Sequence, residues 1–117
     1  MKILSALLAS AFISFAIPAL ADPTGSYAIK GVNPDGSSYT GSVLVTKLGD
    51  TYALTYSLSD SAEVSGTAIG DDDVLSIGYG DDDDIGVALM YRKGDIWEGV
   101  WSYLGAKSLG TEEWRPQ

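Results

Sequence analysis

The sequence predicts an all-β protein folded as an eight-stranded antiparallel up-and-down barrel, and three observations support this prediction. Apolar and polar residues alternate with a period of two through most of the chain after residue 21. Short clusters of Gly, Asp, Asn and Pro interrupt this alternation repeatedly. Every connection is short enough for a hairpin and too short for a helical crossover. A barrel leaves no exposed edge strand, so we prefer it to the alternative, a two-sheet β-sandwich.

The first four strands are expected over residues 25–31, 39–46, 52–58 and 63–69, each with one mainly apolar face. The segment from Asn33 to Gly36 separates the first two strands, because proline presets φ and glycine tolerates a positive φ. Leu48, Gly49 and Asp50 are expected to form the turn before the third strand. The residues expected on the inner face are Tyr27, Ile29, Tyr39, Gly41, Val43, Val45, Tyr52, Leu54, Tyr56, Leu58, Val64, Gly66 and Ala68.

The last four strands are expected over residues 74–79 and 85–91 and, as a hairpin, within residues 94–114. Aspartate runs at 71–73 and 81–84 bound the fifth strand, because like-charged neighbours cannot share a packed strand. Lys93, Gly94 and Asp95 are expected to form the turn after the sixth strand. The residues expected on the inner face are Leu75, Ile77, Tyr79, Ile85, Val87, Leu89, Tyr91, Trp97, Gly99, Trp101 and Tyr103.

Residues 1–21 have the pattern of a secretory signal peptide. Lys2 precedes an apolar run over residues 3–17, and small residues occupy both key positions of the Ala19-Leu20-Ala21 cleavage motif. The run is shorter than the roughly 20 residues that a membrane-spanning helix needs. We therefore expect cleavage near Ala21 and a periplasmic or secreted location. The remainder, residues 22–117, is expected to form a single monomeric domain that does not insert into a membrane.

The acidic composition limits the possible partners. The whole sequence has seven basic and 16 acidic residues, and loss of Lys2 with the signal peptide would change the net charge from −9 to −10. A protein of this charge repels a phosphate backbone, so nucleic acid is not an expected partner. We interpret the acidity as a feature that maintains solubility; the alternative is a specific cationic partner.

Histidine and cysteine are both absent from the sequence. Their absence removes the usual general base, the thiolate nucleophile and the imidazole or thiolate metal ligands. The carboxylates lie mostly in turns, where nothing would raise the pKa of one member of a catalytic pair. We therefore expect no enzymatic activity, no catalytic residues, no cofactor and no metal. The aspartate turns could attract Ca²⁺, but neither has the spacing of a calcium-binding loop, so solvated turns are preferred.

The inner face is expected to carry most of the aromatic residues, which could either fill the core or line a ligand site. The interior of an eight-stranded barrel is only just wide enough to be filled by side chains or to hold one small ligand. If the barrel is hollow, the candidate ligand-binding residues are Tyr52, Tyr56, Trp97, Trp101 and Tyr103. The whole set expected to face inward is Tyr27, Tyr39, Tyr52, Tyr56, Tyr91, Trp97, Trp101 and Tyr103.

The alternation near the C-terminus sends either Glu112 or Glu113 inward. A carboxylate inside a barrel needs a partner, because an unpaired buried charge is costly. Arg92, Lys30 or Arg115 could supply it. A structural ion pair near the barrel mouth is the preferred interpretation, and a ligand anchor is the alternative.

Five segments carry a recognisable pattern: NPDGSSYTG (33–41), GDTYALTYS (49–57), residues 89–91, WEGVWSYLG (97–105) and GTEEW (110–114). Together they resemble a group of small exported bacterial proteins that carry the label fibronectin-binding protein. The resemblance extends over nearly all of the chain after residue 21 and implies the fold more than the activity. The architecture is also similar to that of calycin-like barrels such as avidins. The two aspartate runs depart from the group, and no functional residue is assigned by it.

These observations together predict an exported binding protein without enzymatic activity. Its partner would be an extracellular or envelope protein, as the fibronectin-binding label implies. One alternative is a calycin-like barrel that binds a small organic ligand, and another is an inhibitor of a secreted hydrolase.

Overall fold

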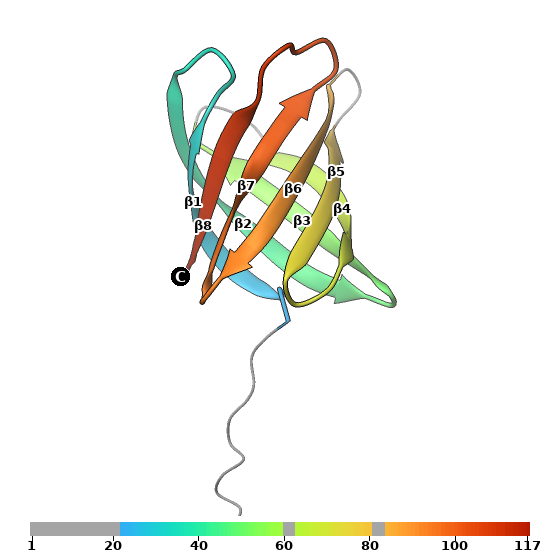
Figure 1. Cartoon of the computed structure of the whole chain (residues 1–117). Helices are drawn as coiled ribbons and strands as arrows, with labels where there is room; N and C mark the ends of the chain where they lie inside the picture. The colour runs from blue at the N-terminus through green and yellow to red at the C-terminus, as the bar shows by residue number, and fades with distance from the viewer. Residues whose placement is uncertain (1–21, 60–62, 81–83) are drawn as a thin grey trace, which may run out of the picture.

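A computed structural model of the chain describes residues 22–59, 63–80 and 84–117, which form a closed antiparallel β-barrel (Figure 1). Each strand pairs with the next, and β8 closes the barrel by pairing with β1. The predicted up-and-down barrel is therefore confirmed. The strands are β1 (Gly25–Val32), β2 (Ser38–Leu48), β3 (Thr51–Leu58), β4 (Glu63–Gly70), β5 (Val74–Gly80), β6 (Ile85–Lys93), β7 (Ile96–Tyr103) and β8 (Gly110–Pro116).

The two ends of the barrel differ. We call the end with the β1–β2 and β7–β8 connections the open end; it is at the top of Figure 1. The opposite end carries the tight β2–β3 and β6–β7 turns, where Gly49 and Gly94 adopt φ of 62° and 67°. These left-handed values favour glycine, so two-residue Gly-Asp turns can connect neighbouring strands without strain.

Side chains fill the barrel toward this second end, which we call the closed end. Trp97 and Trp114 are fully buried, with ring centroids 6.5 Å apart. The Tyr27 ring lies 5.5 Å from the Trp114 ring, centroid to centroid, and its hydroxyl donates to the carbonyl of buried Pro23, just before β1, at 2.8 Å. The Arg92 guanidinium lies 4.7 Å from the centroid of the Trp97 ring, a favourable cation–π distance. This end is therefore a packed core.

The inward face predicted for the sixth strand is wrong. Ile85, Val87, Leu89 and Tyr91 all point outward, whereas Gly86, Ala88 and Met90 are buried. The two-residue turn pairs Lys93 with Ile96 and therefore sets Arg92 opposite Trp97. Since Trp97 points inward, every second residue back from Arg92 shares its face, and a shift by one residue would reverse all of them.

Two of the described turn aspartates, Asp35 and Asp71, accept hydrogen bonds from backbone amides. Asp71 accepts hydrogen bonds from the amides of Asp73 and Val74 at 2.9 and 3.1 Å. Asp35 accepts from the Ser37 hydroxyl at 2.6 Å and from the Ser37 amide at 2.9 Å, and these hydrogen bonds hold the pKa of both carboxyls below the usual range. Among the described residues, no three acidic side chains gather closely enough to hold a metal ion.

Three sequence predictions concern residues outside the described ranges. The predicted signal peptide comprises residues 1–21, which lie outside, as do the aspartates at 60 and at 81–83. No helix within the part of the chain that the structure describes is long and apolar enough to cross a membrane.

Candidate functional site: an aromatic cavity at the open end

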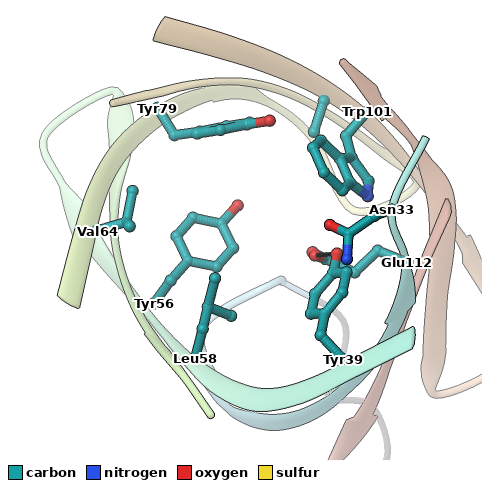
Figure 2. A pocket seen from close by; sticks show the side chains of 9 residues that line it. Asn33, Tyr39, Tyr56, Leu58, Val64, Tyr79, Trp101 and Glu112 are labelled. Atoms are coloured by element: carbon teal, nitrogen blue, oxygen red, sulfur yellow. Dashed lines mark hydrogen bonds between the residues drawn. The ribbon is translucent and has the colours of Figure 1, made fainter. Parts of the chain in front are cut away.

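A cavity of about 100 Å³ lies inside the barrel near its open end (Figure 2). Most of its lining residues are only partly buried, so solvent reaches it. Aromatic rings and one carboxylate surround the space, with apolar side chains at one side. The lining residues are Asn33, Tyr39, Tyr56, Leu58, Val64, Tyr79, Ala88, Trp101 and Glu112.

Strand direction explains why these residues meet. Tyr39 and Glu112 lie near the starts of β2 and β8, whereas Tyr56, Tyr79 and Trp101 lie near the ends of β3, β5 and β7. In an up-and-down barrel, the starts of even-numbered strands and the ends of odd-numbered strands lie at the same end. Inward alternation then directs all five side chains into the same volume.

Glycines on the neighbouring strands accommodate three of these rings. Gly31 is paired with Tyr39, Gly86 with Tyr79, and Gly110 with Trp101. A Cβ atom added to any of these glycines would overlap the ring of its partner. Each ring therefore lies along the barrel wall over a glycine instead of extending across the lumen, which leaves space inside.

The aromatic rings enclose this space because neighbouring rings are steeply inclined to one another. The Tyr39 and Trp101 rings have centroids 6.0 Å apart and planes at 83°, and Tyr79 and Trp101 are 6.4 Å apart at 67°. The Tyr56 and Tyr79 centroids are 6.0 Å apart at 61°. These edge-to-face contacts are the preferred geometry for aromatic pairs. The rings are steeply inclined to one another and form consecutive walls.

Glu112 is the inward member of the C-terminal glutamate pair, as the alternation predicted. Its partners, however, are not the predicted cations: the Tyr39 hydroxyl donates to Oε2, and the Trp114 indole N–H donates to Oε1 at 2.8 Å. Arg115 instead pairs with outward-facing Glu113 at 2.9 Å. The expected ion pair is therefore wrong, because alternation places Arg115 on the outer face.

Burial raises the pKa of the Glu112 carboxyl, and the hydrogen bonds from Tyr39 and Trp114 partly oppose this shift. No lysine or arginine of the described residues lines the cavity. The site thus holds a carboxylate that has hydrogen-bond donors but no neutralising charge within the cavity.

The three phenols of the cavity are neutral hydrogen-bonding groups. Burial raises the pKa of Tyr39, Tyr56 and Tyr79, and the nearby Glu112 carboxylate adds to each shift. The Tyr79 hydroxyl donates to the carbonyl of Ser102 at 2.9 Å. The Tyr56 hydroxyl points into the open space (Figure 2), and none of the described residues hydrogen bonds to it. It is available to a ligand.

The predicted ligand-binding residues divide between the two ends of the barrel. Tyr56 and Trp101 line the cavity. Tyr52 and Trp97 are buried in the core near the closed end. Tyr103 is the last residue of β7 and is 47% exposed. The structure therefore does not bring these five residues together.

The sequence analysis did not include Tyr39 or Tyr79 among the candidate ligand-binding residues, and it gave Glu112 only as an alternative ligand anchor. The sequence did contain a signal for them. Each of these residues lies near the strand terminus that is located at the open end of the barrel. Tyr91, which was expected on the inner face, is 45% exposed on the outside of β6. That expectation is wrong for the same reason as the rest of the β6 face.

Comparisons with known proteins identify the fold only. The sequence matches no family model and no curated protein. Among solved structures, EF1p2_mFAP2b bound to DFHBI has a TM-score of 0.65 and 14% identity, covering 80% of this chain and 93% of that chain. The redesigned barrel mFAP1, also bound to DFHBI, has a TM-score of 0.60 and 15% identity, covering 79% and 94%. At these identities the similarity shows a shared small β-barrel fold.

Proposed function

We propose that this protein binds a small organic molecule in the open-end cavity and acts without catalysis. The observation that carries the proposal is the solvent-accessible space walled by Tyr39, Tyr56, Tyr79 and Trp101. Ligand sites are typically concave, largely aromatic or aliphatic, and equipped with a few polar groups that fix orientation. Glu112 and the Tyr56 hydroxyl are such groups here.

The size of the cavity limits the ligand. Sites for drug-sized molecules measure about 300–1,000 Å³, whereas this cavity measures about 100 Å³. A small molecule, or one end group of a larger molecule that projects from the open end, fits this volume. The two designed barrels that bind DFHBI support the proposal, because they show that a barrel of this fold can bind an organic ligand.

The proposal is tested by NMR with a library of small organic compounds. The three tryptophans each contribute one indole N–H signal. Ligands should shift the signals of Trp101, which lines the cavity, and Trp114, which donates to Glu112, more than that of Trp97 near the closed end. Equal shifts for all three signals, or no bound compound, would contradict the proposal.

A pair of leucine substitutions supplies the control. Ala88→Leu adds a side chain to the cavity wall and should abolish binding, whereas Val87→Leu alters the outward-facing neighbour and should not. Binding that survives Ala88→Leu in a folded protein would place the ligand elsewhere.

A second candidate function is protein binding outside the cytoplasm, which the resemblance to the fibronectin-binding group implies. The observation that favours it is the apolar outer face of β6, where Ile85 and Val87 are 59% and 61% exposed. Surface plasmon resonance against fibronectin tests this candidate directly. Binding should be lost in a Val87→Lys variant and retained in Ala88→Leu; binding that Val87→Lys leaves unchanged would exclude this face.

A further inference from the structure

We infer that the ligand of the open-end cavity is a small organic cation, an alkylammonium group held between the Glu112 carboxylate and the faces of the aromatic rings. This inference rests on the proposed function, because it assigns a chemical class to the ligand of the same site. Three independent features of the described residues support it.

The first feature is the uncompensated carboxylate. Glu112 has two neutral donors, Tyr39 and Trp114, and no positive charge lines its cavity within the described part of the chain. Removing a carboxylate from water is costly unless an opposite charge accompanies it. A cationic ligand would supply that charge, whereas an anionic ligand would increase the cost.

The second feature is the arrangement of the rings. Tyr39, Trp101, Tyr79 and Tyr56 follow one another around the cavity with centroids 6.0–6.4 Å apart and steeply inclined planes. Aromatic rings attract a cation that lies within about 6 Å of their centroids, and cages of such rings recognise quaternary ammonium groups. Figure 2 shows these side chains around a common space that Glu112 also faces.

The third feature is the contrast with the closed end. There, the Trp97 ring is covered by the guanidinium of Arg92 at 4.7 Å, and the Tyr52 ring by the ammonium of Lys47 at 4.6 Å. No comparable cation lies over the rings of the open-end cavity among the described residues. A ligand cation would give these rings the interaction that the protein provides for itself at the closed end.

The overall charge favours the same ligand class. The sequence carries a net charge of −9, and exposed Asp35 lies in the β1–β2 connection at the open end. A negative field raises the local concentration of cations and speeds their association. Anions would be repelled before they reached the cavity.

The experiment compares three molecules of similar shape by isothermal titration calorimetry. Choline is the cation, dimethylbutanol is the uncharged analogue in which carbon replaces nitrogen, and dimethylbutyrate is an anion with the same branched end. We expect choline to bind at least about tenfold more tightly than dimethylbutanol, from the combined cation–π and charge interactions. Dimethylbutyrate should bind most weakly.

Two glutamine substitutions then separate the local charge from the overall charge. Glu112→Gln should weaken choline binding by about tenfold and change dimethylbutanol binding by less than about twofold. Glu113→Gln removes the same charge from the outer face and should leave the preference for choline nearly intact. Equal effects of the two substitutions would overturn the assignment of Glu112.

The wild-type protein offers a test that does not depend on the folding of a variant. Choline binding should weaken as the pH is lowered through the raised pKa of Glu112, because protonation removes the negative charge. The phenols that face Glu112 from β2, β3 and β5 stay neutral in this range, since their pKa values are raised. Choline affinity that does not change across this pH range would overturn the inference.

The outcomes distinguish this inference from the proposed function. Binding of dimethylbutanol as tightly as choline, or preferential binding of dimethylbutyrate, would overturn the cationic assignment and leave a small-molecule site in place. Failure of all three probes to bind overturns the cationic assignment; if the compound library also produces no shift at Trp101, the proposed function fails with it.

Discussion

The orientation of β6 makes a sharp prediction, because two adjacent residues should respond oppositely to the same truncation. Met90 is fully buried, and its sulfur lies close to the position that a side chain on Gly99 would occupy. Truncation by Met90→Ala would leave a cavity beside a residue that has no side chain to fill it. We expect a loss of about 2–5 kcal/mol in the free energy of unfolding. Leu89 is 36% exposed on the outer face, so Leu89→Ala should cost at most about 1 kcal/mol.

Urea unfolding followed by tryptophan fluorescence measures both losses, and equal m-values would show that both variants unfold from comparable states. Lysine substitutions at the same two positions extend the test. Leu89→Lys should fold, because its ammonium reaches solvent, whereas Met90→Lys would bury a charge and should not. A larger loss for Leu89→Ala than for Met90→Ala would refute the register described above. Such a result would instead support the orientation predicted from the sequence, in which the large apolar residues of β6 point inward.

Three further predictions concern the two ends of the barrel. Gly86→Ala should displace the Tyr79 ring that lies over it and cost about 1–3 kcal/mol, with ligand binding lost; unchanged stability and binding would contradict this. Arg92→Ala removes side-chain hydrogen bonds to three backbone carbonyls and the contact with Trp97, and should cost about 1–3 kcal/mol by thermal unfolding, without weakening ligand binding. Burial raises the Glu112 pKa above its ordinary 4.5, so wild-type stability relative to Glu112→Gln should fall as pH rises through that raised value. If the stability of the wild type relative to Glu112→Gln instead increased with pH, the pKa of Glu112 would be depressed.

The barrel itself was predictable, because period-two alternation and short turns constrain the topology strongly. The face of β6 was not evident from hydrophobicity, since its outer residues, such as Val87 and Leu89, are larger than inward Gly86 and Ala88. The information lay in the turn: a two-residue connection at Gly94 fixes which residues oppose Trp97. When both faces of a strand are apolar, the register set by the turn therefore predicts the inward face better than side-chain size does.

The cavity was less predictable than the fold. Alternation correctly sends Tyr56 and Trp101 inward, but it does not show whether a ring crosses the lumen or lies along the wall. That depends on cross-strand pairs such as Gly110 with Trp101, which become visible only once the register is known. The partners of Glu112 depend on the same register, since they come from β2 and from the next inward position of β8.

The two ends of the barrel explain how the fold can tolerate such a site. An open cavity and a partly buried carboxylate both reduce stability, and small proteins have little stability to lose. Near the closed end, Trp97 and Trp114 pack without exposure, and Arg92 donates hydrogen bonds to backbone carbonyls of two strand connections and of the segment before β1. Stability concentrated there allows the open end to retain unfilled space and Glu112. Substitutions that fill the open-end cavity should therefore stabilise the protein while they abolish binding, which is the trade-off expected of a functional site.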